Sequence, residues 1–121
     1  MINKTSFTSE YRFFVGLTRG NGDTIAPTLR GKKLATKTAQ ARLQQARTLF
    51  NDKGYPALTV FNASGSWEGK TERTYVISVF ACDADFERLS ELGEFLLKSF
   101  EQDAVLLDVI GGKHQGRYFI E

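Results

Sequence analysis

The chain has 121 residues, of which 41% are hydrophobic and 25% are charged, and its formal net charge is +2. This composition is typical of a folded globular protein and excludes the low-hydropathy, highly charged composition of a disordered chain. The length is that of one domain. We therefore expect a single domain over residues 1–121, with a core at about residues 11–110 and a C-terminal tail at 111–121.

No segment of the sequence is typical of a membrane span or a secretory signal. The longest apolar runs are a few residues long, whereas a span needs about 18. Residues 1–8 are polar and lack the apolar stretch of a secretory signal, and a lone cysteine, Cys82, cannot form an internal disulfide. We expect a cytoplasmic protein that does not contact a membrane.

Positive and negative charges are unevenly distributed along the chain. Residues 1–54 carry ten Lys and Arg against three acidic residues, and the remainder carries six against eleven. The first half is therefore predicted to attract anions, and the acidic second half to attract another copy of the protein.

Alternating apolar residues predict a first strand at residues 11–18. A turn follows, because Asn21 and Gly22 both tolerate positive φ.

Residues 33–52 repeat apolar side chains with the spacing of a helix, and Gly54 predicts where that helix ends. The apolar arc consists of Ala35, Ala39, Leu43, Ala46, Leu49 and Phe50. Because it is rich in alanine, the helix should lie close to a sheet. Arg42 projects into this arc. We favour the interpretation that its side chain reaches past the core to solvent. The alternative is that it meets a buried anion or carboxylate.

Two further strands are predicted at residues 57–63 and 73–81 from their aromatic and β-branched content. Residues 64–72 between them are polar and contain glycine, so we expect a loop longer than a minimal hairpin.

A second helix is predicted at residues 83–101, where Asp83 or Asp85 is placed to cap the N-terminus. A fourth strand follows at 104–110, and residues 118–120 are expected to pair at a sheet edge or at a dimer contact.

This element order, β-α-β-β-α-β, predicts an α+β fold of the ferredoxin-like plait type, with two helices on one face of an antiparallel sheet. The other face is left open, and we expect a homodimer to cover it, because an exposed apolar patch is unfavourable. The side chains predicted on this face are Phe14, Thr59, Phe61, Val76 and Phe80.

The plait brings several polar chain segments together at one end of the sheet, where we predict a ligand site. Its residues are Arg19, Lys33, Trp67, Glu68, Glu72 and Gln102. The arginine and lysine would neutralise an anion, the indole would stack on a planar ring, and Glu72 and Gln102 would read hydrogen-bonding edges. In the alternative interpretation, Trp67 packs on the core as a lid, and Glu72 and Gln102 tie the loop to the strand ends.

Signatures of catalysis are weak. Glu68 and Glu72 have the residue types of an acid and base pair, but ordinary surface carboxylates are the favoured interpretation. His114 and Cys82, each the one residue of its type, lack the spacing of metal ligands or of a nucleophile and its base. We predict no catalytic residue, metal site or cofactor.

A basic surface on the first helix is the alternative site, for nucleic-acid phosphates. Its residues are Arg30, Lys32, Lys33, Lys37 and Arg47. An RNA-recognition module is not favoured, because its aromatic motif residues are missing and the aromatics of the predicted strands are Phe14, Tyr75 and Phe80.

Residues 58–69 read LTVFNASGSWEG. They resemble the L-T-V-x-x-A-x-G-x-W motif of a small uncharacterised family found in bacteria and their phages, and residues 16–22 and 100–106 are similar to the opening and closing motifs of that family. The resemblance covers about residues 11–108 and implies a ferredoxin-like fold, but no established activity and no catalytic residues. The basic, alanine-rich stretch at 25–53 departs from the family pattern.

From these features we expect a non-enzymatic binding protein for a small anionic or nucleotide-like ligand, held at the Trp67 end of the sheet. One alternative is a protein-interaction module, such as a phage or mobile-element accessory factor directed against host defence. The other is a protein that binds nucleic acid through its phosphates.

Overall fold

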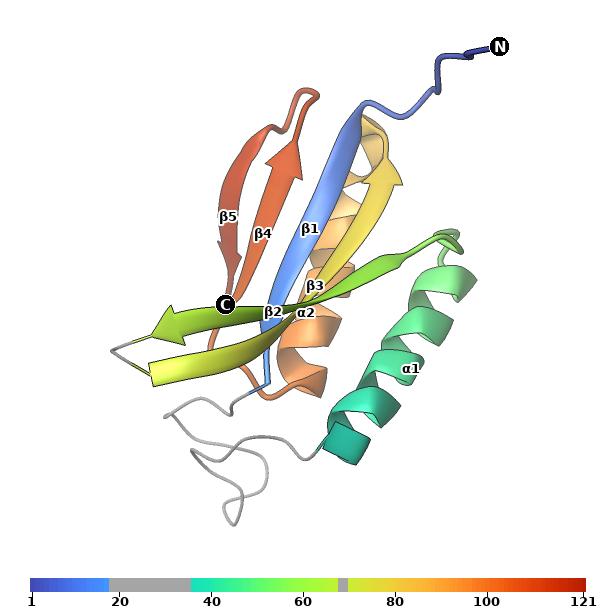
Figure 1. The fold of residues 1–121 in the computed structure, drawn as a ribbon. Coiled ribbons are helices and arrows are strands. Elements are labelled where there is room, and N and C mark those ends of the chain that lie inside the picture. Colours follow the sequence, from blue (N-terminus) through green and yellow to red (C-terminus); the bar gives the residue numbers. More distant parts are fainter. Residues whose placement is uncertain (18–35, 68–69) are drawn as a thin grey trace.

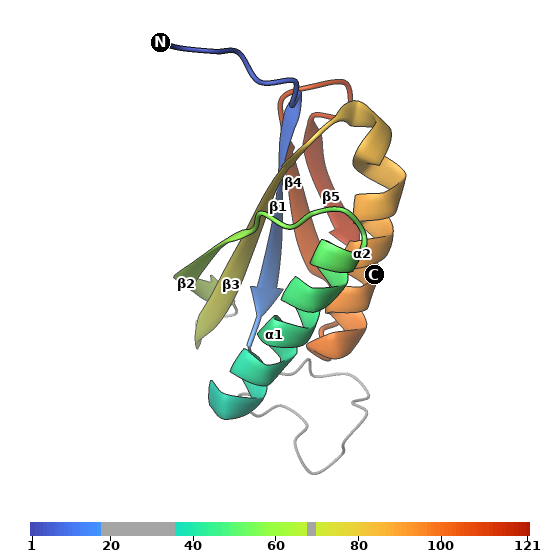
Figure 2. The same ribbon diagram turned by 90° about the vertical axis from the view of Figure 1, so that its right-hand side faces the viewer.

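The computed structural model describes residues 1–17, 36–67 and 70–121 (Figure 1), with the backbone alone described at positions 36–37, 67 and 70–72. Within these residues, a five-stranded antiparallel sheet carries two α-helices on one of its faces (Figures 1 and 2). The elements are β1 (Ser9–Gly16), α1 (Thr36–Asp52), β2 (Thr59–Trp67), β3 (Lys70–Ala81), a 3₁₀ turn (Asp83–Asp85), α2 (Phe86–Ser99), β4 (Val105–Ile110) and β5 (Gly116–Ile120).

The strand order is β2-β3-β1-β4-β5, which places β1 in the middle of the sheet. Antiparallel ladders join β1 to both neighbours, so that Phe13 is opposite Ile77 in β3 and Leu107 in β4. The predicted α+β class and antiparallel sheet are confirmed, and the architecture is consistent with a ferredoxin-like fold. Part of the predicted C-terminal tail forms β5, which pairs with β4 at the sheet edge, one of its two predicted arrangements.

The core lies between the sheet and the helices. Alternate residues of β1 are buried there, as the sequence pattern predicts, because successive side chains of a strand point to opposite faces. The innermost residues are Tyr11, Phe13, Val15, Ala39, Ala46, Phe50, Ile77, Leu89, Leu96 and Leu107, all at most 1% exposed. Short alanine side chains let α1 lie close to the sheet, where Phe13 and Phe50 meet edge to face with ring centroids 5.9 Å apart.

The second helix begins later than predicted, since residues 83–85 form a 3₁₀ turn. Asp85 is the acidic residue that ties down this start. Its Oδ2 accepts a hydrogen bond from the Cys82 N–H at 2.8 Å, and its Oδ1 accepts one from the Tyr55 hydroxyl at 2.7 Å. Burial, together with this carboxylate, raises the pKa of Tyr55 to about 12.

Neither of the two described helices is long and apolar enough to cross a membrane. Cys82 is a half-buried free thiol.

The predicted loop at residues 64–72 is wrong, because β2 runs to Trp67 and β3 starts at Lys70. The last residue of β1, Gly16, is opposite Thr74 of β3, whereas β2 and β3 stay paired as far as Trp67 and Lys70. The hairpin of β2 and β3 therefore extends past the rest of the sheet as a two-stranded arm. Figures 1 and 2 show this arm projecting away from both helices. A strand that packs against no other layer needs no apolar alternation, and its sequence therefore reads as a loop.

Close packing of α2 on the sheet depends on Gly93. A Cβ at this position would meet Ile120 Cδ1 and lie 3.1 Å from Phe13 Cε1. We expect Gly93→Ala to lower the free energy of unfolding in urea by about 1–3 kcal/mol, because overpacking outweighs the better helix propensity of alanine.

Gly65→Ala is the matched control, since a Cβ there lies 3.8 Å from Thr74 Oγ1, an ordinary contact. Its unfolding free energy should stay within about 0.5 kcal/mol of the parent. Equal stability of the parent and Gly93→Ala would contradict the close approach of α2 to β1 and β5.

Candidate functional site

One end of the sheet gathers several chain segments. The end of β1, the start of α1, the end of α2 and the start of β4 lie there together (Figures 1 and 2). This is the end at which the sequence predicts a ligand site.

The end of α1 shows how a helix in this protein normally stops. Gly54 follows the helix with a φ of 99°, in the left-handed region that favours glycine. The Tyr55 N–H donates to the Phe50 carbonyl at 2.8 Å, and the Gly54 N–H donates to the Asn51 carbonyl at 3.1 Å. These two bonds form a Schellman motif, which confirms Gly54 as the predicted stop.

The end of α2 has the same motif, but a residue other than glycine takes its left-handed position. The Gln102 N–H donates to the Leu97 carbonyl at 3.0 Å, and the Glu101 N–H donates to the Lys98 carbonyl at 3.2 Å. Glu101, with a φ of 53°, takes the left-handed position that Gly54 takes after α1. It is the one residue other than glycine with positive φ in the described chain. Such a conformation costs about 1–2 kcal/mol relative to glycine, and strain of this kind clusters at functional sites.

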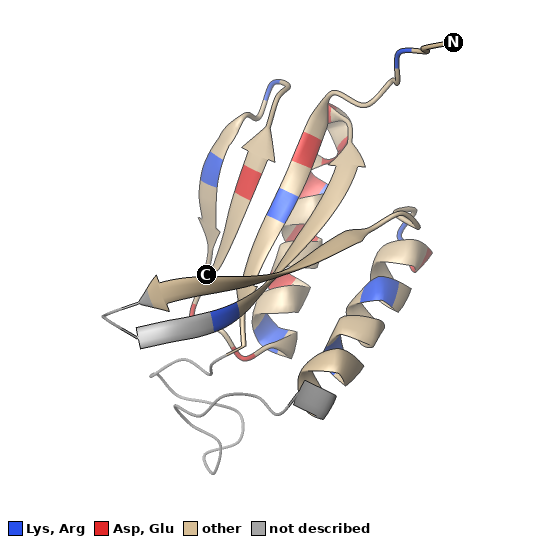
Figure 3. Ribbon diagram, in the orientation of Figure 1, with Lys and Arg blue, Asp and Glu red and all other residues tan. Residues whose placement is uncertain are grey.

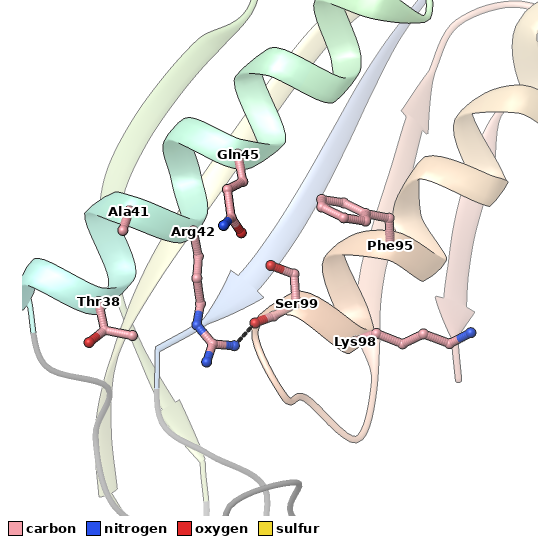
Figure 4. A pocket seen from close by; sticks show the side chains of 7 residues that line it. All are labelled: Thr38, Ala41, Arg42, Gln45, Phe95, Lys98 and Ser99. Carbon is pink, nitrogen blue, oxygen red and sulfur yellow. Dashed lines mark hydrogen bonds between the residues drawn. The ribbon is translucent and has the colours of Figure 1, made fainter.

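This unusual backbone places a carboxylate inside the protein. The Glu101 side chain is only 3% exposed, and its Oε2 lies 3.9 Å from Arg42 Nη2 of α1. Arg42 Nη1 also donates a hydrogen bond to the Ser99 carbonyl at the end of α2 (Figure 4). A buried carboxylate is tolerated when a cation lies beside it, so Arg42 and Glu101 depend on each other. The favoured prediction for Arg42, a side chain reaching past the core to solvent, is wrong, and the buried carboxylate partner is the observed arrangement.

Arg42 also lines a groove between α1 and α2, with a volume of about 670 Å³. The lining residues are Thr38, Ala41, Arg42, Gln45, Phe95, Lys98 and Ser99. Figure 4 shows Gln45 and Phe95 pointing into the space between the helices from opposite sides, while Lys98 points away. The volume is in the range of small-molecule sites, and the groove offers an aromatic wall, an amide and a guanidinium.

Most of the ligand site predicted from the sequence falls outside what the structure describes. Arg19, Lys33 and Glu68 lie outside the described residues. Trp67 and Glu72 are placed by their backbones alone, on the projecting arm, opposite Lys70 and Gly65. Gln102 is described, and its Nε2 donates to the Phe100 carbonyl at 3.0 Å, a local contact within the turn that follows α2.

The predicted nucleic-acid surface is described only in part. Arg47 is exposed on α1, the side chain of Lys37 is not described, and Arg30, Lys32 and Lys33 lie outside the described residues. Tyr75 is buried on the helix side of the sheet, edge to face with Phe100 at 6.2 Å, so it offers no face to a base.

Glu101 is not among the site residues predicted from the sequence. Two features of the sequence are consistent with its position. No glycine follows the second predicted helix, so another residue must take the left-handed position there. Arg42 interrupts the apolar arc of the first predicted helix, so it needs a polar partner. No group of three His, Cys, Asp or Glu side chains that could hold a metal ion occurs in the part of the chain that the structure describes.

Solved structures with a similar fold include two of a phage SAM lyase. One is a phage SAM lyase in its apo state, with a TM-score of 0.73 and 22% sequence identity. The other is a phage SAM lyase in complex with S-methyl-5'-thioadenosine, with a TM-score of 0.71 and 21% identity. Each match covers 99% of this chain and 94% of the lyase chain. At this identity the likeness establishes the fold.

No family model matches the chain, and no curated protein matches it either. The motif resemblance to a bacterial and phage family therefore stays a prediction.

The function predicted from the sequence is corrected by these likenesses. We expected a non-enzymatic binding protein, with a protein-interaction module or a nucleic-acid-binding protein as alternatives, whereas the two similar structures are of an enzyme. The lone His114 and Cys82 argue only against enzymes that use a metal ion or a protein nucleophile. They say nothing against an enzyme whose substrate already carries its own leaving group.

The mutual dependence of Arg42 and Glu101 can be measured by a double-mutant cycle. Arg42→Met leaves a buried carboxylate without its guanidinium, so we expect a loss of about 1–3 kcal/mol in the free energy of unfolding in urea. Adding Glu101→Gln removes the buried negative charge, and the double variant should lose less than the two single variants together.

Arg47→Met, on the exposed side of the same helix, controls for the loss of an arginine and should change stability by no more than about 0.5 kcal/mol. Additive losses in the cycle would show that the two side chains do not interact.

Proposed function

We propose that this protein is a lyase that cleaves S-adenosylmethionine (SAM) and releases S-methyl-5'-thioadenosine. The likeness to phage SAM lyase carries this proposal, because it extends over 99% of the chain and one of the two structures holds that nucleoside. The groove beside Arg42 supports it, since it has the volume for such a ligand.

The names of substrate and product define which bond breaks. S-methyl-5'-thioadenosine keeps the methyl group and the adenosyl group of SAM, so the bond from sulfur to Cγ of the methionine portion is cleaved. Its electron pair goes to sulfur, which changes from a sulfonium cation to a neutral thioether. A lyase adds no water, so Cγ must gain its new bond from within the substrate. Either the substrate's own carboxylate oxygen bonds to Cγ and closes a lactone, or Cβ loses a proton and a double bond forms between Cβ and Cγ. Both four-carbon products are one water lighter than homoserine, the hydrolysis product.

Such a reaction asks the protein for binding and orientation more than for a nucleophile. Because positive charge on sulfur disappears as the bond breaks, a carboxylate held against sulfur would stabilise the substrate more than the transition state. We therefore place the charged residues at the amino-acid end of SAM, with Arg42 binding the substrate carboxylate. Glu101 is a positioning residue that holds the guanidinium, and Phe95 supplies an apolar wall.

For the fold, we propose the full ferredoxin-like plait with β5 as an added edge strand. The strand order β2-β3-β1-β4 and the two helices on one face support this assignment. For the compartment, we propose the cytoplasm, which the free thiol of Cys82 supports.

The activity is tested by incubating the purified chain with SAM and following both products by liquid chromatography and mass spectrometry. We expect one S-methyl-5'-thioadenosine for each SAM consumed, with a four-carbon product one water lighter than homoserine. Arg42→Met should lower kcat/KM by at least about tenfold, because a charge-assisted hydrogen bond to substrate is lost.

Arg47→Met is the matched control and should retain the activity of the parent chain. Absence of the nucleoside product from the parent chain would overturn the proposed function, and full activity of Arg42→Met would overturn the proposed site.

A further inference from the structure

The groove between α1 and α2 has two ends of different chemistry. At one end, the Arg42 guanidinium donates to the Ser99 carbonyl. The two helices run in opposite directions, so Gln45 of α1 and Phe95 of α2 lie on the same side of this contact (Figures 1, 2 and 4). One end of the groove is therefore charged, and the other is formed by an aromatic ring and an amide.

The charge that lines the groove is positive. Figure 3 shows basic residues on α1 and at the end of α2, where these helices border the groove. Lys98 points away from the space between the helices, whereas Arg42 reaches across it (Figure 4). Among the described lining residues none is acidic. The groove thus offers the carboxylate of a substrate a guanidinium, and its described lining offers the sulfonium group no carboxylate.

Spacing along the helices matches the spacing of atoms in SAM. Phe95 precedes Ser99 by four residues, which is about 6 Å along a helix axis. Four single bonds separate the carboxylate carbon of SAM from its sulfur, a span of about 5 Å. A substrate carboxylate held by Arg42 therefore places the sulfur at the level of Phe95, and the adenosyl group lies beyond the bond that breaks.

On the basis of the proposed function, we infer that the site accepts sulfonium α-amino acids as a class, including those in which a small alkyl group replaces the adenosyl group. Cγ gains its new bond from a carboxylate oxygen or from Cβ, and both belong to the four-carbon portion that every member of the class shares. Arg42 binds this shared portion. The leaving group is a neutral thioether in every case, so the bond that breaks is of the same kind.

S-methylmethionine is the simplest probe of this class, since a methyl group stands where SAM has adenosyl. Cleavage of its bond from sulfur to Cγ sends the electron pair to sulfur and releases dimethyl sulfide. The four-carbon product is the one formed from SAM. No proton moves if a lactone closes, and the Cβ proton passes to water if a double bond forms. Because the adenosyl contacts are lost, kcat/KM should be lower than for SAM.

The test incubates the purified chain with SAM or with S-methylmethionine. The nucleoside is measured by liquid chromatography, and dimethyl sulfide by gas chromatography of the headspace. We expect dimethyl sulfide to form at least about tenfold faster than without protein, because Arg42 orients the shared portion. Arg42→Met should lower kcat/KM by at least about tenfold for both substrates, and Arg47→Met, the matched control, should lower neither.

Phe95→Ala tests the order of the substrate in the groove. It should lower the ratio of kcat/KM for SAM to that for S-methylmethionine by about tenfold, because an apolar contact to the leaving nucleoside is lost. A partly unfolded variant would lower both values equally and leave the ratio unchanged, so the ratio reports the contact itself. An unchanged ratio would overturn this placement of the substrate.

A parent chain that cleaves SAM but releases no dimethyl sulfide above the protein-free rate would overturn the inferred substrate class and leave the proposed function standing. A parent chain that cleaves neither substrate would overturn both.

Discussion

The buried carboxylate of Glu101 is the constraint on which the candidate functional end of this molecule depends. A carboxylate removed from water needs a cation beside it, and Arg42 supplies one from α1, a helix whose most deeply buried positions include small alanines. The same guanidinium holds the Ser99 carbonyl at the end of α2. One arginine therefore connects α1 to the end of α2 and also lines the groove between the two helices. The groove and the ion pair form one structural unit.

The backbone at Glu101 shows that this arrangement is not the most stable one available. The two helices end in the same hydrogen-bonding motif, and after α1 the left-handed position is occupied by Gly54, without strain. After α2 it is occupied by a glutamate whose side chain turns inward. A residue that raises the energy of the backbone while adding a buried charge is expected where function outweighs stability.

Local patterns in the sequence predicted most of the fold. The alternation in β1, the alanine-rich arc of α1 and the glycine after it each follow from a few neighbouring residues, and the placement of both described helices on one face of the sheet followed from the element order. The two-stranded arm was missed because strands that cover no core carry no apolar alternation. The contact between Arg42 and Glu101 was missed because it joins residues far apart in the sequence. The likeness to a SAM-cleaving enzyme was missed because a sulfonium substrate carries its own leaving group, and such an enzyme needs no metal or protein-nucleophile motif that a sequence would show.

Under the proposed function, Glu101 occupies a glycine position because its carboxylate is needed to hold Arg42 for SAM cleavage. The most direct measurement is the rate of S-methyl-5'-thioadenosine release from SAM by Glu101→Gly, compared with Glu101→Ala and the parent chain. We predict that both variants lose at least about tenfold in rate, because each leaves Arg42 without the carboxylate that holds it. Glu101→Gly should nevertheless be the more stable of the two by about 1 kcal/mol, since glycine relieves the left-handed strain. A Glu101→Gly chain that cleaves SAM at the parent rate would contradict the account.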